Sequence, residues 1–315
     1  MNQSKQSKFP LGLVVNLLTA VAFGYICFLS ANFYTLGDKT DSITLAIIIT
    51  FLLSGTSLGA KFLKQTKRNF KSRFIWEIIL LVLFTVFTAY FTYFPFSHYL
   101  GVKEKQKKIQ CELNTSIMQA EKMFTEYERY VSERKSDYES NLRSAVLTMN
   151  ASDEDFRKYG FVRNSISYNE QINTKMTTID FDLLPSNFEQ MKKDNTEWLA
   201  NSKRSVNDWK AIGLVDVTNN VEQNSKDWKS KLIKLSEIRE IGEKREVFKY
   251  KLDGFNGVQK YFTTHSNPTP VSIGLSIVAY LLMLVSYVLT TRSTRSSFGF
   301  RALFSKKTSG FDIEF

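Results

Sequence analysis

The chain has 315 residues, a formal net charge of +11 and two cysteines, Cys27 and Cys111. One cysteine lies inside an apolar run and the other outside one, which excludes a disulfide framework and a zinc-binding spacing. Residues 101–267 carry 28 Lys and Arg against 26 Asp and Glu. The positive excess therefore gathers beside the apolar segments, where it sets membrane topology, and we expect no nucleic-acid binding.

Four apolar segments are long enough to cross a membrane, which takes about 20 mostly apolar residues per helix. They cover residues 11–34, 43–60, 74–96 and 271–291. The first is too long, and too poor in small residues at a cleavage site, to be a signal peptide. The sequence predicts an all-α membrane protein with four transmembrane helices. A long helical stalk, with a small mixed cap as an option, is inserted between the third and fourth.

Small residues recur at helical spacing in the first two segments. Ala20 and Gly24 lie four residues apart in the first segment, and Gly55 and Gly59 do so in the second. Such pairs let helices approach closely within a membrane. They favour tight packing within the bundle or between copies, so we expect a homo-oligomer embedded in membrane lipids.

Basic residues gather in the segments that would lie on one side of the membrane, whereas the loop between the first two apolar segments has only Lys39, beside Asp38 and Asp41. Two lysines precede the first segment, six basic residues lie in the loop 61–73, and five lie in the tail 292–315. The positive-inside rule then places residues 1–10, the loop and the tail in the cytoplasm. We expect a multi-pass protein of a bacterial inner membrane, with residues 11–98 as three spans, 99–270 in the periplasm and 271–291 as the fourth span.

Glu77 is the one ionisable residue well inside an apolar segment. Intramembrane carboxylates are functional candidates by default. However, Arg73 precedes Glu77 by one helical turn, close to the predicted membrane boundary. An ion pair between them, with the side chains reaching toward water, accounts for Glu77 without a function. The sequence therefore predicts a structural Arg73–Glu77 ion pair.

The inserted segment is predominantly helical in pattern. Residues 103–150 contain neither Gly nor Pro, and their apolar positions follow spacings of three and four, which predicts one long helix with a buried stripe. The pattern loosens over residues 159–185, where 176–181 fits a short strand or an extended cap. Further helices are predicted over 186–214 and 217–251. We expect the chain to climb one long helix and return through two shorter ones.

The motifs of nucleophilic, metal-dependent and phosphate-binding catalysis do not occur in the sequence. The two histidines, His98 and His265, each lie just outside a span on the predicted outer side, so they are expected to be neighbours. A pH-sensing or metal-binding pair is one interpretation, but two ligands make a poor metal site. We predict no enzymatic activity, no cofactor and no metal.

The tail 292–315 combines basic and aromatic residues, a composition that suits the inner leaflet surface. Its last residues alternate apolar and acidic side chains, a pattern that fits docking on the sheet edge of a partner. We therefore predict that a cytoplasmic protein binds Phe311, Asp312, Ile313, Glu314 and Phe315. A tail without a partner is the alternative interpretation.

The loop 61–73, the long helix over 103–150 and the tail 310–315 together resemble the TssN-type inner-membrane subunit of the Bacteroidota type VI secretion system. The resemblance covers the whole chain and is architectural. It implies a scaffold within a multi-subunit membrane complex, with envelope partners on the stalk and cytoplasmic machinery on the tail. Two alternatives remain open: an oligomeric pore or defence effector, and a transmembrane sensor that signals through its fourth span.

Overall fold

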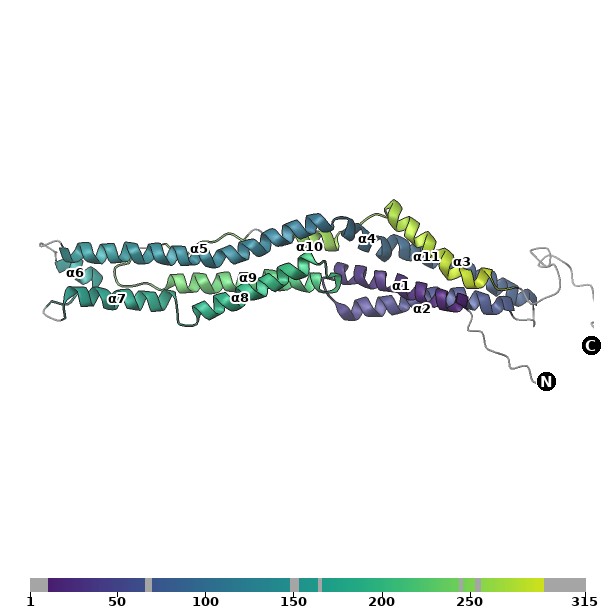
Figure 1. Ribbon diagram of the computed structural model, residues 1–315, viewed down its shortest axis with the longest axis horizontal. Helices are drawn as coiled ribbons and strands as arrows, with labels where there is room; N and C mark the ends of the chain where they lie inside the picture. Colours follow the sequence, from purple (N-terminus) through teal and green to yellow (C-terminus); the bar gives the residue numbers. More distant parts are fainter. Residues whose placement is uncertain are drawn as a thin grey trace, which may run out of the picture. The chain divides into compact units, whose positions relative to one another are not determined.

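A computed structural model describes residues 11–65, 70–147, 153–163, 166–243, 246–252 and 256–291 (Figure 1). The chain divides into two compact units. Unit 1 comprises Met1–Glu104 and Phe262–Phe315, and unit 2 comprises Lys105–Tyr261. Regular structure in the described ranges is helical, without a β-strand. The predicted helical fold class is confirmed for this part of the chain.

Unit 1 contains four helices that are long and apolar enough to cross a membrane, counted over the described residues. They are α1 (Leu11–Tyr34), α2 (Lys39–Gln65), α3 (Phe70–Phe91) and α11 (Pro270–Val288). The second helix begins four residues before the predicted segment because the Asp38 carboxylate accepts the backbone N–H groups of Thr40 and Asp41 at 3.0 and 3.1 Å. The prediction of four apolar, membrane-compatible helices is confirmed.

The helices of unit 1 pack around an apolar centre. Its buried residues are Ala20, Phe23, Cys27, Ile49, Leu53, Phe84, Phe91, Phe96 and Met283. The rings of Phe23 and Phe96 stack with their centroids 4.5 Å apart. Many of the largest apolar side chains instead face outward, as Leu18 (64% exposed) and Phe51 (72% exposed) do. Unit 1 is therefore apolar both inside and outside, which suits a lipid environment and not water.

The third apolar helix does not run straight to its end. Phe94 has an extended backbone, Pro95 follows through a cis peptide bond, and the chain then resumes as α4 (Ser97–Glu104). Proline has no N–H to donate, so the α-helical ladder cannot pass through this point unchanged. The segment η1 (Thr92–Phe96) thus separates α3 from α4 and brings Phe96 and His98 into the interior of unit 1.

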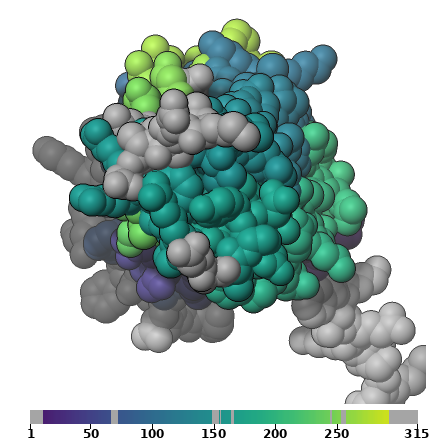
Figure 2. All heavy atoms as spheres, turned by 90° about the vertical axis from the view of Figure 1, so that its left-hand side faces the viewer, coloured from purple at the N-terminus to yellow at the C-terminus, as the bar shows by residue number. Residues whose placement is uncertain are grey.

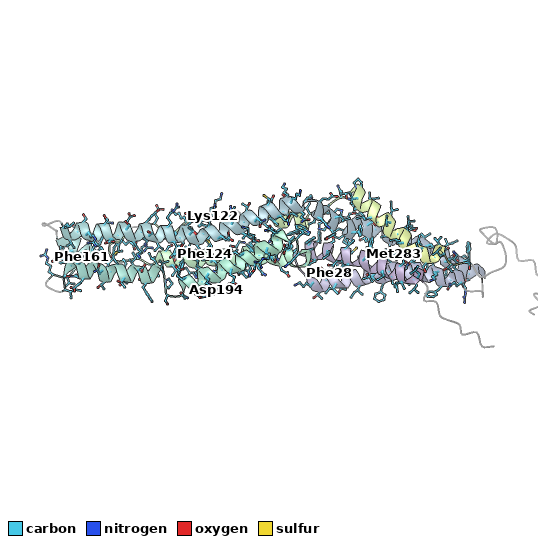
Figure 3. The ribbon with its side chains drawn as sticks, viewed as in Figure 1. Phe28, Lys122, Phe124, Phe161, Asp194 and Met283 are labelled. Carbon is cyan, nitrogen blue, oxygen red and sulfur yellow. The ribbon has the colours of Figure 1, made fainter. Side chains whose placement is uncertain are left out.

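Unit 2 is built on α5 (Gln106–Leu147), which is about 63 Å long at 1.5 Å per residue. One face of α5 is buried, and Phe124 on that face points between the helices while Lys122 points away (Figure 3). The remaining helices are α6 (Asp153–Tyr159), α7 (Tyr168–Leu183), α8 (Phe188–Asn207), α9 (Ala211–Glu237) and α10 (Asn256–Thr263). The predicted long helix with one buried stripe is therefore present, three residues shorter at each end.

Helix α7 corrects the prediction of a strand or extended cap over residues 176–181. These residues lie in the interior of α7. Ser167 caps the helix by accepting the N–H of Glu170, whose side chain accepts the N–H of Ser167 in return. The threonine hydroxyls that suggested a strand donate to carbonyls one turn earlier instead, as Thr178 does to Thr174 at 3.1 Å. Local capping thus outweighs the strand-like composition.

Two passes of unit 2 follow from contacts along α5. Tyr127 of α5 donates to the Leu183 carbonyl at the end of α7, and Gln110, near the start of α5, donates to the Val206 carbonyl at the end of α8. Helices α7 and α8 therefore descend antiparallel to α5. Figure 2 views unit 2 from the end where α5 finishes beside α6 and α7.

The helix predicted over 186–214 is interrupted at Trp209, whose φ of 48° turns the chain into α9.

Helix α9 runs in the same direction as α5, which the sequence did not predict. The Trp228 ring lies 5.7 Å from that of Phe124, and the Ser236 carbonyl near the end of α9 accepts from Arg134, further along α5. The chain must still return to α10, where Tyr261 donates to Glu112 at 2.9 Å. The helix predicted over 217–251 therefore stops at Glu237. The described residues 238–243 and 246–252, which we call the strap, return along α5 without helical structure.

The distance that the chain must cover along α5 explains why the described residues of the strap are not helical. Near the start of the strap, Tyr138 donates to the Ile241 carbonyl, and Gly257, the second residue of α10, lies beside Glu112. The stretch of α5 from Glu112 to Tyr138 is about 39 Å long. A helix from Ile241 to Gly257 would cover only about 24 Å, whereas an extended chain covers up to about 53 Å. A helix is therefore too short to make the return, which explains why the described residues 238–243 and 246–252 are not helical although the sequence favours a helix.

Candidate functional site

A cluster of polar side chains lies inside unit 1 and joins its four apolar helices. Glu77 of α3 is 1% exposed, and its carboxylate accepts the hydroxyl of Tyr287 of α11 at 2.5 Å. Lys64 of α2 donates to the Tyr287 carbonyl at 2.9 Å and lies 4.3 Å from the centre of its ring. Three helices that are distant in sequence thus meet at one tyrosine.

Asn16 supplies the contribution of α1 to this cluster. Its amide nitrogen donates to the Ser57 hydroxyl of α2 at 2.8 Å and to the Met283 carbonyl of α11 at 2.5 Å. The amide oxygen of Asn16 and the hydroxyl of Ser286 are buried and have no hydrogen-bond partner among the described residues. A polar side chain inside a membrane bundle is costly unless paired, so Asn16 fixes the relative rotation of α1, α2 and α11.

The predicted Arg73–Glu77 ion pair stays a prediction. The structure places a further partner on another helix, since the Glu77 carboxylate accepts the hydroxyl of Tyr287 on α11. Spacing along one helix can suggest Arg73 as a partner of Glu77. It cannot identify Tyr287, which lies on another helix 210 positions further along the chain. A polar residue near the end of the fourth apolar segment is the only signal in the sequence, and it does not identify the partner.

The four small residues of the predicted packing motifs take different positions. A Cβ on Gly24 would lie 2.1 Å from the Thr50 hydroxyl, so α1 and α2 make their close approach here, beside the buried Ala20. A Cβ on Gly59 would meet Leu80 of α3 at 3.0 Å. Gly55 has open space around it. The Gly55–Gly59 pair therefore does not form one packing face within the chain.

His98 and His265 lie together, as their positions at the ends of two spans predicted. Their rings are 6.5 Å apart and inclined by 19°, and Phe94 lies against both. The Nε2 atom of the buried His98 pairs with the Phe262 carbonyl at 2.8 Å. Within the described ranges, no group of three or more His, Cys, Asp or Glu side chains could hold a metal ion. The surroundings are those of a packed aromatic cluster.

Unit 2 contains a buried ion pair that the sequence did not predict. Arg134 of α5 is 1% exposed and Glu243 of the strap 4% exposed, and two guanidinium nitrogens pair with the two carboxylate oxygens, one of them at 2.7 Å. Arg134 also donates to the carbonyls of Ser236 and Ile238. Every donor direction is occupied, which is what a buried guanidinium requires.

Aromatic residues continue the attachment of the strap along α5. Tyr130 donates to the Glu246 carbonyl at 2.7 Å, and Tyr250 of the strap donates to the Gln119 carbonyl at 2.8 Å. Phe248 is buried against Tyr127 and Tyr130, with ring centres 5.2 and 5.6 Å away. Burial raises the pKa of Tyr127 far above its ordinary value, and the same cause acts on Tyr138. Both hydroxyls therefore stay protonated donors.

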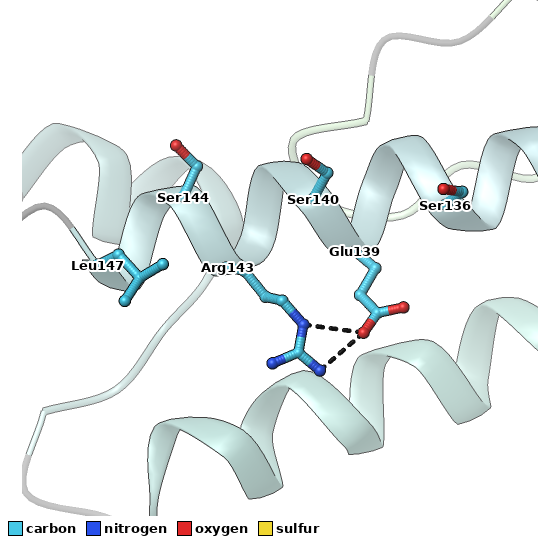
Figure 4. Close-up of a pocket in the computed structure, with 6 residues that line it drawn as sticks. All are labelled: Ser136, Glu139, Ser140, Arg143, Ser144 and Leu147. Atoms are coloured by element: carbon cyan, nitrogen blue, oxygen red, sulfur yellow. Dashed lines mark hydrogen bonds and ion pairs between the residues drawn. The ribbon is translucent and has the colours of Figure 1, made fainter.

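A surface hollow of about 580 Å³ lies on α5 (Figure 4). Its lining consists of Ser136, Glu139, Ser140, Arg143, Ser144 and Leu147. Arg143 donates through two nitrogens to one oxygen of Glu139, at 2.9 and 2.7 Å, so the two charges neutralise one another. The serines Ser136, Ser140 and Ser144 stand on one exposed face of α5.

Two apolar grooves mark the outside of unit 1. One measures about 370 Å³ between α1 and α2, and the other about 470 Å³ between α3 and α11. The second ends at a hydrogen bond of 3.1 Å between Thr85 and Tyr280. The predicted docking residues Phe311, Asp312, Ile313, Glu314 and Phe315 lie outside the described residues.

Comparisons with known proteins give no family. No protein-family model matches the chain, no curated protein matches it, and no solved structure matches it. The function proposed below is therefore based on the residues of this chain and their arrangement.

Proposed function

We propose that the chain is a non-enzymatic anchor and scaffold subunit of a multi-protein complex in a bacterial inner membrane. Unit 1 crosses the membrane four times with both chain ends in the cytoplasm, and unit 2 extends into the periplasm. The TssN-type resemblance of the sequence favours a secretion-system membrane complex. Envelope subunits bind unit 2, and a cytoplasmic protein binds the tail.

One observation carries this proposal: the surface of unit 1 is apolar, whereas the surface of unit 2 is charged. Unit 1 exposes large apolar side chains such as Leu18 and Phe51. Unit 2 encloses its apolar stripe and exposes charged pairs such as Arg129 with Glu126 and Glu133. An apolar exterior is stable in lipid and a charged exterior in water. The combination suits a protein that is held in a membrane in order to present a water-exposed domain.

The interior of unit 1 supports an anchor more than a pore. Phe23, Phe84 and Phe96 fill the centre of the bundle, and the polar residues Asn16 and Glu77 lie to one side of this apolar layer. A conducting path needs polar groups or open space along its length. A pore through a single copy would have to disrupt this packing. We therefore expect the purified protein to produce no ion conductance in planar bilayers.

The two natural cysteines provide a direct test of the topology. Cys111 is exposed on α5, while Cys27 is buried in unit 1. A membrane-impermeant maleimide added to intact spheroplasts should label Cys111, and Cys111→Ser should abolish the label. If labelling requires lysis, unit 2 lies in the cytoplasm and the proposed orientation is wrong.

Purification in a mild detergent with mass spectrometry tests the scaffold role itself. Several envelope and cytoplasmic proteins should copurify with the full chain. Recovery of the chain alone, together with ion conductance in bilayers, would favour the pore instead. Genes encoding the copurified proteins near the gene for this chain would identify the complex.

A further inference from the structure

We propose that the strap, the described residues 238–243 and 246–252, is a releasable segment of unit 2 and that the Arg134–Glu243 pair is the clasp that holds it. In this arrangement the strap opens as a unit while α5, α8 and α9 stay folded. Opening frees the chain that leads to α10 and onward to the fourth apolar helix.

The way in which the strap is held supports this proposal. The helices of unit 2 bury continuous apolar stripes and satisfy their backbone groups internally. The described part of the strap buries one large apolar side chain, Phe248. Its other attachments include the clasp, hydrogen bonds from Tyr130, Tyr138 and Tyr250, and a hydrogen bond of 3.0 Å from the Phe248 N–H to the Ser236 hydroxyl of α9. Segments with few buried apolar contacts and a water-exposed backbone open before the rest of a domain.

The clasp concentrates the attachment at one point. Arg134 joins the end of α9, the start of the strap and Glu243 through its donors to Ser236, Ile238 and the carboxylate. A buried ion pair is strongly sensitive to the loss of one partner, because the other charge is then buried without compensation. Breaking this pair therefore acts on the strap far more than an average surface substitution does.

A glycine beside the clasp restricts the strap to its bound path. Gly242 has a φ of 85°, and a Cβ there would lie 2.6 Å from the Lys158 carbonyl and 2.7 Å from the Tyr159 ring.

Hydrogen–deuterium exchange of the full chain in detergent tests the proposal. In the unmodified protein, peptides that cover 246–252 should exchange at least tenfold faster than those of α8 and the centre of α9. Arg134→Met and the milder Glu243→Gln should each accelerate exchange in the strap at least tenfold more and leave α8 unchanged. The control is Arg129→Met, which removes exposed ion pairs from the same helix and should alter neither region.

The proposal is overturned if the strap and the helices of unit 2 exchange hydrogen at the same rate, or if a substitution accelerates exchange in both equally. If the strap exchanges at the rate of α8 and α9 in the unmodified protein, the strap is an integral part of the bundle. Equal acceleration of strap and helices by Glu243→Gln leads to the same conclusion. Failure of Arg134→Met to fold does not weaken the test, because the unmodified protein and Glu243→Gln decide it.

Discussion

The carboxylate of Glu77 on α3 accepts a hydrogen bond of 2.5 Å from the hydroxyl of Tyr287 on α11, across 210 positions of sequence. This bond joins the third and fourth apolar helices at the end of unit 1 where Lys64 also reaches Tyr287. Further along the two helices, Thr85 and Tyr280 share a hydrogen bond of 3.1 Å beside a groove of about 470 Å³. The Glu77–Tyr287 bond is the more buried of these two connections between α3 and α11.

Replacing Tyr287 by Phe should loosen this connection. The substitution removes only the hydroxyl, and we expect the free energy of unfolding to fall by about 1–2 kcal/mol. Thermal unfolding in detergent measures the change. The matched control is Tyr280→Phe, which removes the hydroxyl that faces Thr85 at an exposed position and should cost less. Equal effects of the two substitutions would show that the Glu77 bond has no special role.

Replacing Gly24 by Ala should separate α1 from α2, because the new Cβ would lie 2.1 Å from the Thr50 hydroxyl. Overpacking of this kind costs about 1–3 kcal/mol. Gly55→Ala provides the control, since the space around Gly55 is open. A second substitution, Thr50→Ala, should recover part of the loss at Gly24. If Gly24→Ala is as stable as Gly55→Ala, the close approach is not needed.

The stability of unit 2 should depend on the protonation of Glu240. Burial, and after it the charges of Asp182 and Glu243, raise the pKa of this carboxyl above its ordinary value, while Lys175 opposes the shift. A raised pKa in the folded state means that protonation favours folding, and that this gain is lost as the pH rises through the raised pKa. Glu240→Gln should therefore increase the melting temperature at pH 7 and leave it unchanged near pH 4.

Glu246 provides a contrast of opposite sign in the same strap. Its hydrogen bond and ion pair with Lys249 lower its pKa. The folded state therefore favours the ionised carboxyl, and its small contribution is present at neutral pH and is lost as the pH falls through the lowered pKa. Glu246→Gln should slightly lower the melting temperature at pH 7. Changes of the same sign in both variants would contradict the assigned causes.

Deletion of residues 311–315 tests the predicted docking by the tail. The four apolar helices do not include these residues, so membrane insertion and thermal stability should stay as in the full chain. The recovery of cytoplasmic proteins in a purification should fall, while the recovery of envelope proteins persists. If the shortened chain retains every partner, the tail has no docking role. A matched deletion at residues 1–5 controls for loss of length at a chain end.

The sequence predicted the elements that depend on local composition. The four apolar helices follow from uninterrupted runs such as residues 271–291, and α5 follows from a stretch without Gly or Pro. The sequence failed where tertiary distance decides the structure. The sequence of 238–251 favours a helix, yet the described residues 238–243 and 246–251 are not helical, because a helix would be too short to reach Glu112 from Tyr138. The partner of Glu77 was likewise missed because Tyr287 enters from another helix.

The strap also determines the order in which unit 2 can be completed during synthesis. Arg134 is made 109 residues before Glu243. At about 5–20 residues per second, roughly 5–20 s pass between the two. During that interval α7 and α8 can cover much of α5, but the Arg134 guanidinium has no carboxylate and Phe248 has not yet arrived. The newly made domain thus has a period in which its stripe is incompletely covered, and prevention of aggregation in that period falls to other proteins of its compartment.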